Sequence, residues 1–250
     1  MEVRQLRGLM IGMLVTIAIV TLGGFVVVRE LEKTGSSMVI LPWDEECSVA
    51  LGSGRVGLSR EDARVATTAV ALQARGAEAP PVTMIDPAVM RRLREGPSED
   101  AGPSLACRAS PAGDLAEQKM GESGLTERAE RVRTAMTEVF GPQELGGFQP
   151  GGVSTGHGES SAHYDGRAID IFFRPVNEEN RRAGWLLAHW LVAHSEELHI
   201  DVIIFDDHIW STSVSMAGWR PYNAPEPADE VLRHLDHVHV DVQKGTPRGH

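Results

Sequence analysis

A strict alternation of valine with polar residues near the C-terminus places two histidines on one face of a predicted β-strand. The alternating residues are Val238, Val240 and Val242 on one side and His237, His239 and Asp241 on the other. Side chains in a strand point alternately to opposite faces, so the valines can be buried while both imidazoles point the other way. The pattern therefore predicts a half-buried strand whose polar side carries two candidate metal ligands.

A second strand-like segment, residues 167–173, carries a carboxylate. Its β-branched and aromatic residues favour a strand from which Asp170 projects. His163 lies seven residues before Asp170, and Gly166 between them allows the backbone to turn without a Cβ clash. Two imidazoles and a carboxylate are three protein ligands, the number that a catalytic zinc takes when its fourth position is left to water.

The spacing of these residues resembles that of a known peptidase family. Ser161-x-His163-x-x-Gly166-x-Ala168-x-Asp170, followed by Asp236-His237-x-His239, is similar to the motifs of the zinc D-alanyl-D-alanine carboxypeptidases and dipeptidases. These enzymes belong to the wider group of lysostaphin-type, carboxypeptidase and hedgehog-like metallopeptidases. The resemblance covers roughly residues 124–242. It implies a Zn²⁺ ion held by His163, Asp170 and His239, and a substrate among peptidoglycan stem peptides or other cell-envelope peptides.

The same resemblance implies catalytic roles for Asp236 and His237. Asp236 matches the general base, and His237 matches a histidine that steadies the oxyanion or shares the base role. A regular strand would put residues 236 and 239 on opposite faces, so Asp236 can reach the site only if the strand begins at His237. No motif matches the arginine that stabilises the transition state in some members. Ser161 has no base to orient it, so we expect it to support the site by hydrogen bonding.

Several of these features also have ordinary structural explanations. A His-x-His pair on a strand can be exposed or can be satisfied in a core. Three aromatic residues could line a peptide site or pack in a core: Trp210, Trp219 and Tyr222. Three histidines lack the i, i+4 spacing of helical metal sites and are expected to be structural: His189, His194 and His199. The two motifs taken together, with a complete three-ligand set, favour the metal site.

An uninterrupted apolar run at residues 8–28 is long enough to cross a membrane as a helix, which needs about 20 residues. Arg4 and Arg7 precede it, which predicts a cytoplasmic N-terminus and an extracytoplasmic C-terminal domain. No small-residue cleavage site follows the run, so a retained signal anchor is favoured over a cleaved signal peptide. The expected localisation is the cell membrane, with a single pass.

The chain divides into seven expected parts, and its predicted fold class is α+β. The parts are a cytoplasmic N-terminus (1–7), the anchor (8–28), a stalk (29–46), a small segment (47–107), a linker (108–124), a peptidase-like domain (125–245) and a tail (246–250). Helices are expected at 60–74, 87–94, 127–140 and 178–198, and a hairpin at 201–213. We expect a small antiparallel sheet flanked by helices in the C-terminal domain, preceded by a single transmembrane helix and a small, mainly helical segment.

Cys47 and Cys107 are the only cysteines. An extracytoplasmic compartment permits a disulfide between them, and the alanine-rich segment that separates them would gain from such a crosslink. We therefore predict a Cys47–Cys107 disulfide; the alternative is two unrelated buried thiols.

A formal net charge of −11 makes nucleic acid and anionic lipid surfaces poor partners. With the expected location, this favours a substrate in the cell envelope. The predicted function is a membrane-anchored zinc metallopeptidase-like protein that hydrolyses amide bonds in peptidoglycan stem peptides. Two alternatives remain: a non-catalytic module of the same fold that binds metal or cell-wall peptide, and a structural anchor in which the metal only stabilises the fold.

Overall fold

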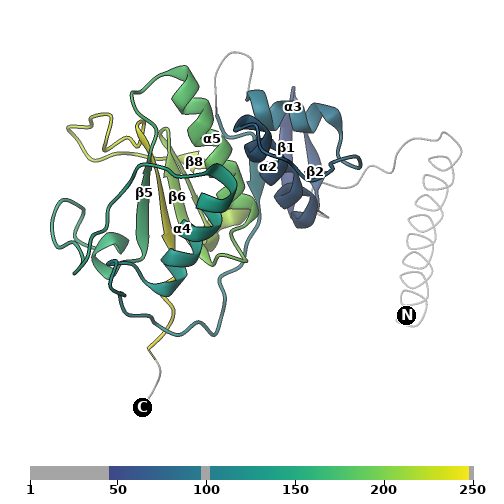
Figure 1. Cartoon of the computed structure of the whole chain (residues 1–250). Coiled ribbons are helices and arrows are strands. Elements are labelled where there is room, and N and C mark those ends of the chain that lie inside the picture. The colour runs from purple at the N-terminus through teal and green to yellow at the C-terminus, as the bar shows by residue number, and fades with distance from the viewer. Residues whose placement is uncertain (1–44, 97–101, 248–250) are drawn as a thin grey trace, which may run out of the picture. The chain divides into compact units, whose positions relative to one another are not determined.

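The computed structural model describes residues 45–96 and 102–247 (Figure 1). The predicted anchor at residues 8–28 and most of the predicted stalk lie outside the described residues. Within the described ranges, no helix is long and apolar enough to cross a membrane. The described residues all belong to one compact unit.

A six-stranded antiparallel sheet carries both predicted motifs. Its strand order is β4-β5-β9-β6-β7-β8, and each neighbouring pair is antiparallel. The strands are β4 (Leu145–Gly146), β5 (Ala168–Phe172), β6 (Ile200–Phe205), β7 (His208–Ser211), β8 (Arg220–Pro221) and β9 (His237–Val242). The predicted antiparallel sheet is confirmed, and the predicted hairpin is formed by β6 and β7. Strand β9 begins at His237, which is the condition under which Asp236 can lie beside the site.

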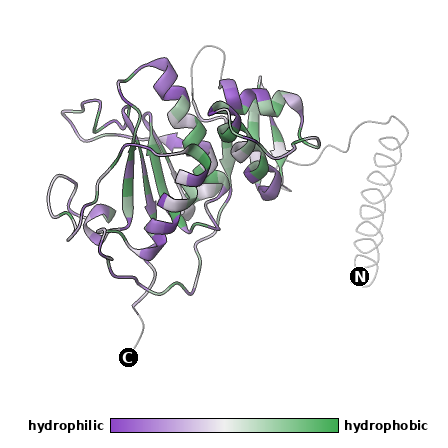
Figure 2. Ribbon diagram, in the orientation of Figure 1, coloured by the Kyte–Doolittle hydropathy of each residue, from purple (hydrophilic) through white to green (hydrophobic). Residues whose placement is uncertain are grey.

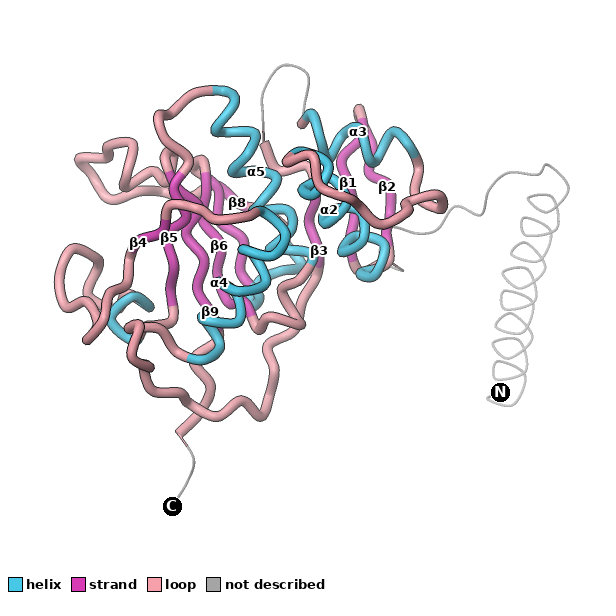
Figure 3. Tube along the Cα trace, viewed as in Figure 1, coloured by secondary structure: helices cyan, strands magenta, loops and turns pink. Residues whose placement is uncertain are grey.

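Alternation along β5 and β9 gives this sheet a core face and a polar face. The three valines of β9 are at most 1% exposed and belong to the same hydrophobic core as Ile169 and Ile171 of β5. Helices α4 (Glu127–Phe140) and α5 (Glu178–Ala193) contact these central strands and share that core (Figures 1 and 3). Figure 2 shows the strands as largely hydrophobic, whereas both helices have hydrophobic and hydrophilic parts. The polar face is therefore the one that presents Asp170, His237 and His239.

The helix starts follow the predicted capping residues. Side-chain oxygens of three N-cap residues accept a backbone N–H in the first turn of α2 (Arg60–Ala74), α4 and α5: Ser59, Thr126 and Asn177. Helix α3 (Pro87–Glu95) starts after Asp86, which caps it in the same way. Helix α5 ends at Ala193, earlier than the predicted residue 198. The chain turns there to enter β6, and the Ile200 N–H donates to the Ser195 carbonyl at 2.8 Å.

The small segment contains a three-stranded sheet as well as α2 and α3. Its order is β2-β1-β3, with β1 (Cys47–Leu51), β2 (Gly54–Leu58) and β3 (Leu105–Cys107) all antiparallel. The segment shares one hydrophobic core with the larger sheet. Two of the three predicted aromatic residues join the two parts, because the indole N–H groups of Trp210 and Trp219 donate to carbonyls of Cys107 and Leu105. These contacts assign both tryptophans to packing.

Cys47 and Cys107 form a disulfide, as predicted. They are also register partners in β1 and β3, so the bond fixes a strand pair that closes a separation of 60 residues. A crosslink over that separation stabilises by about 4 kcal/mol if its main effect is on the entropy of the unfolded chain.

We expect Cys47→Ala/Cys107→Ala to lower the free energy of unfolding by about this amount in chemical denaturation. The reduced wild-type protein should unfold like the variant, and equal stability with and without the bond would contradict the expectation.

Candidate metal centre

Asp170 and His239 face each other across two paired strands. They are direct register partners in β5 and β9, and both project from the polar face. Antiparallel partners bring their side chains within contact distance, and His239 Nδ1 lies 3.1 Å from Asp170 Oδ1. Both residues are less than 10% exposed. The pairing of these strands, which lie far apart in the sequence, is what brings two predicted ligands together.

His163 reaches the same point from a short helical turn, η1 (Ala162–Asp165). The Ser161 side chain accepts the His163 N–H and begins the turn, and Gly166 ends it at a φ of 67°. Ser161 thus supports the backbone of a predicted ligand, in line with the expected supporting role. The Gly166 conformation is one that other residues rarely adopt, which explains the glycine in the motif.

The donor atoms of the three predicted ligands form a small triangle. His163 Nε2 is 3.1 Å from His239 Nδ1 and 3.3 Å from Asp170 Oδ1, and the third side is the 3.1 Å contact between His239 and Asp170. Zinc bonds of about 2.0–2.1 Å at tetrahedral angles would place ligand atoms roughly 3.3 Å apart. The three donors therefore have the separations that a small tetrahedral cation requires.

The outer nitrogen of each of these imidazoles also faces an acceptor. His163 Nδ1 donates a hydrogen bond to the Gly147 carbonyl at 2.8 Å. The proton is therefore on Nδ1, and the lone pair of Nε2 is free to bind a metal. His239 Nε2 lies 3.7 Å from Asp241 Oδ2, so Nδ1 is the ring nitrogen that faces the site. Metal-binding histidines commonly have this kind of outer partner. A Cβ added at Gly147 would lie 2.2 Å from the His163 ring and 2.8 Å from Asp170, so position 147 must be glycine.

Electrostatics within the triangle favour a cation. Burial alone would raise the pKa of Asp170, but hydrogen bonds and charge interactions with His163 and His239 hold it well below its usual value. Burial alone would lower the pKa of His239, whereas Asp170 and Asp241 raise it to about 9. An ionised carboxylate thus attracts positive charge to the site, and a metal would replace the proton on His239.

Asp236 and His237 form a pair beside the triangle. Asp236 Oδ1 accepts from His237 Nδ1 at 2.7 Å, and His237 Nε2 is directed to the site, 3.7 Å from Asp170 Oδ1. Burial would raise the pKa of Asp236, but hydrogen bonds to His237 and Arg174 lower it. The Asp236 carboxylate is therefore ionised, and it fixes the proton of His237 on Nδ1.

Arg174 is a residue of the site that the motifs did not identify. Its guanidinium binds Asp236 Oδ2 at 2.7 Å and stacks over Phe172, with Cζ 3.8 Å from the ring centroid. Arg174 lies two residues after the end of β5, the strand that carries Asp170. Its only sequence signal is this position, and its partner is far away in the chain.

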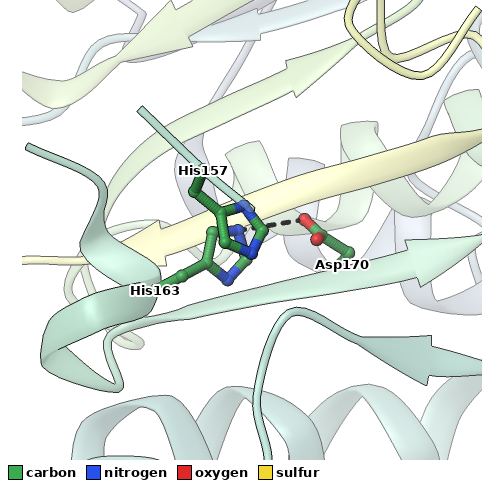
Figure 4. A group of neighbouring side chains, drawn as sticks. All are labelled: His157, His163 and Asp170. Carbon is green, nitrogen blue, oxygen red and sulfur yellow. Dashed lines mark ion pairs between the residues drawn. The ribbon is translucent and has the colours of Figure 1, made fainter. Parts of the chain in front are cut away.

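Two further histidines lie at the centre and were not predicted. His157 stacks on His163 with ring centroids 3.9 Å apart, and its ligand atom lies within 4.8 Å of those of His163 and Asp170 (Figure 4). The His234 ring is 4.6 Å from that of His237 and 5.0 Å from that of Tyr222. Both histidines lie outside helices and strands, and His234 has a φ of 54°. Periodicity could not place them, since they follow no regular element.

The three histidines that were expected to be structural make local contacts elsewhere in the fold. His189 accepts the Ser104 N–H at 2.9 Å, and burial, with a smaller effect of Arg92, lowers its pKa to about 3. His194 contacts Thr68, and the carbonyl of His199 accepts from Gln243. These contacts tie α5 and the turn after it to neighbouring segments.

Comparison with known protein families shows a similarity over part of the chain. Residues 121–230 are similar to the family described as VldE, C-terminal domain. No curated protein and no solved structure matches the chain. The similar region includes His157, His163, Asp170 and Arg174 and ends before Asp236, so it contains two of the three predicted ligands.

Proposed function

We propose that this protein is a membrane-anchored, extracytoplasmic zinc peptidase that hydrolyses amide bonds in peptides of the cell wall. The observation that carries the proposal is the triangle of His163, Asp170 and His239 donors at 3.1–3.3 Å, with the Asp236–His237 pair at its edge. Two imidazoles and one carboxylate suit zinc better than magnesium or calcium, which prefer oxygen ligands. The predicted anchor at residues 8–28 and the acidic net charge support a substrate in the envelope.

The side chains beside the triangle can move a proton. A divalent ion held by the three ligands would supply Lewis acidity, lowering the pKa of a water molecule and stabilising negative charge on oxygen. His237 has its Nδ1 proton held by Asp236, so Nε2 carries a free lone pair on the side of the site. Nε2 can accept a proton from an attacking water and return it to the leaving amine. The Asp236 carboxylate stabilises the imidazolium that forms between these steps, and Arg174 keeps this carboxylate in place.

This assignment differs from the role that the motif resemblance implies for Asp236. Both carboxylate oxygens are engaged, one by His237 and the other by Arg174. The group nearer to the triangle is His237. We therefore assign the general-base role to His237 and the role of orienting it to Asp236.

A non-catalytic metal-binding module is the second candidate, and one observation favours it. His157 lies close enough to His163 and Asp170 to supply a fourth protein ligand. Structural zinc sites have four protein ligands, whereas catalytic sites keep one position open. The two candidates differ in whether a metal-loaded protein turns over peptide.

Incubation of the full-length protein in detergent with defined stem peptides tests the proposal. We expect one zinc ion per chain. Mass spectrometry of the peptides should detect the two products of amide hydrolysis. A chelator should stop the reaction, and added zinc should restore it. One bound zinc without cleavage of any stem peptide would favour the non-catalytic module, and absence of zinc would contradict both candidates.

A further inference from the structure

We propose that His157 is a fourth, exchangeable ligand of the metal centre. The inference rests on the proposed three-ligand site and adds a state to it. With no peptide bound, His157 occupies the position that a catalytic site leaves to water. When peptide enters, His157 leaves and water or substrate takes its place.

The first support is the position of the His157 ring. Its ligand atom and those of His163 and Asp170 all lie within 4.8 Å of one another, and the ring is stacked on His163 with an interplanar angle of 21° (Figure 4). A metal ligand must point a nitrogen lone pair at the ion, which two closely stacked rings cannot both do. A rotation of the His157 side chain is therefore needed to turn a nitrogen onto the ion. The stacked position is adjacent to the bound one.

The second support is a clamp that sets His157 relative to a ligand. The His157 N–H donates to the Tyr164 hydroxyl at 3.1 Å, and this hydroxyl donates to the His157 carbonyl at 2.6 Å. Tyr164 follows His163 directly in η1. The backbone of His157 is thus fixed to the same turn that carries His163, and its side chain stays within reach of the ion.

The rest of the loop is suited to movement. Residues 154–160 form no helix or strand, and His157 is the only one of them that is not exposed. Gly156 has a φ of 92°, and neither it nor Gly158 has a non-adjacent atom within 4 Å of where a Cβ would be. Exposed segments with few contacts open at low cost in free energy. Release of His157 therefore needs little more than the loss of its bond to the metal and a rotation of its side chain, and the Tyr164 clamp on its backbone can stay in place.

The exchange is a change of ligand and needs no other reactant. A bond between a neutral His157 nitrogen and the ion forms as a water molecule leaves, and the reverse occurs on release. The remaining three protein ligands keep the metal in place in both states. The same site can then be closed at rest and open during turnover.

Cobalt(II) absorption of the full-length protein tests the proposal, with thiocyanate as a probe for an open coordination position. In the wild type we expect thiocyanate to change the spectrum little, because His157 holds the fourth position. In His157→Ala the probe should change the spectrum at low concentration, and the Kd for cobalt should rise about tenfold, as for loss of a supporting interaction. Tyr164→Phe removes the hydroxyl that forms the clamp and keeps the aromatic ring of residue 164. Its thiocyanate response should lie between those of the wild type and His157→Ala. Glu159→Ala, an exposed residue of the same loop, should behave like the wild type.

Four outcomes separate this inference from the proposed function. Identical thiocyanate responses in the wild type and His157→Ala would overturn the role of His157 and leave the three-ligand site intact. Complete loss of cobalt from His157→Ala would make His157 a permanent ligand and overturn the exchange. No cobalt in any variant would overturn both this inference and the proposed function. The expected responses without cleavage of peptide would support His157 and contradict the peptidase.

Discussion

Replacing His239 by alanine should abolish stoichiometric metal binding. His239 Nδ1 forms two sides of the donor triangle, and its loss leaves two fixed ligands, His163 and Asp170, beside the exchangeable His157, whose ring must rotate to reach the ion. Two fixed ligands and one that must rotate into place hold a divalent cation far more weakly than three fixed ligands. We expect the metal content after dialysis to fall from one ion per chain to a small fraction of one. Elemental analysis of the purified full-length protein measures it directly.

His237→Ala is the matched control for this variant. It removes the same side chain from the same strand and the same face, but His237 Nε2 lies 3.7 Å from Asp170 Oδ1, farther than His239 Nδ1. We expect this control to retain one metal per chain. Wild-type metal content in His239→Ala, or equal losses in both variants, would show that His239 is not a ligand.

Local features of the sequence predicted the elements of this site well. The alternation of valine with polar residues predicted β9, in which the valines lie in the core and His237 and His239 point to the opposite face, where they are also buried. The helix starts at Ser59, Thr126 and Asn177 were predictable, since a side-chain oxygen satisfies a free backbone N–H at each of these positions. Motif spacing indicated three donors that the structure places within 3.3 Å of one another.

Features that depend on distant contacts could not be predicted from the sequence. Strand β3 exists because it pairs with β1 near the disulfide, and a segment of this length has no clear pattern of its own. His157 comes to the site through a loop held by Tyr164. Arg174 gains its role from a contact with Asp236, which is 62 residues away. Each of these depends on tertiary structure that residue periodicity does not encode.

Asp236→Asn and His237→Ala should each retain metal and lose hydrolysis. His237 provides the nitrogen that accepts the proton, and Asp236 holds the other ring nitrogen at 2.7 Å and carries the compensating charge. Removal of a general base typically costs 10²- to 10⁴-fold in rate, and we expect a loss of this order for His237→Ala. Asparagine in place of Asp236 removes the charge and permits the wrong proton position on the ring, so it should also cost roughly 10²-fold or more. The measurements are kcat and KM on a stem peptide, with metal content determined for each variant.

The double variant shows whether Asp236 acts through His237. If it does, Asp236→Asn/His237→Ala should be no slower than His237→Ala alone, because the carboxylate has nothing left to orient. KM should change little in either single variant, since both residues are assigned to proton transfer and Asp236 is already bound by His237 and Arg174. Asp229→Asn is a suitable control, because asparagine can still accept the Leu232 N–H that Asp229 accepts at 2.8 Å. Losses that multiply in the double variant would instead make Asp236 a base in its own right, as the motif resemblance implies.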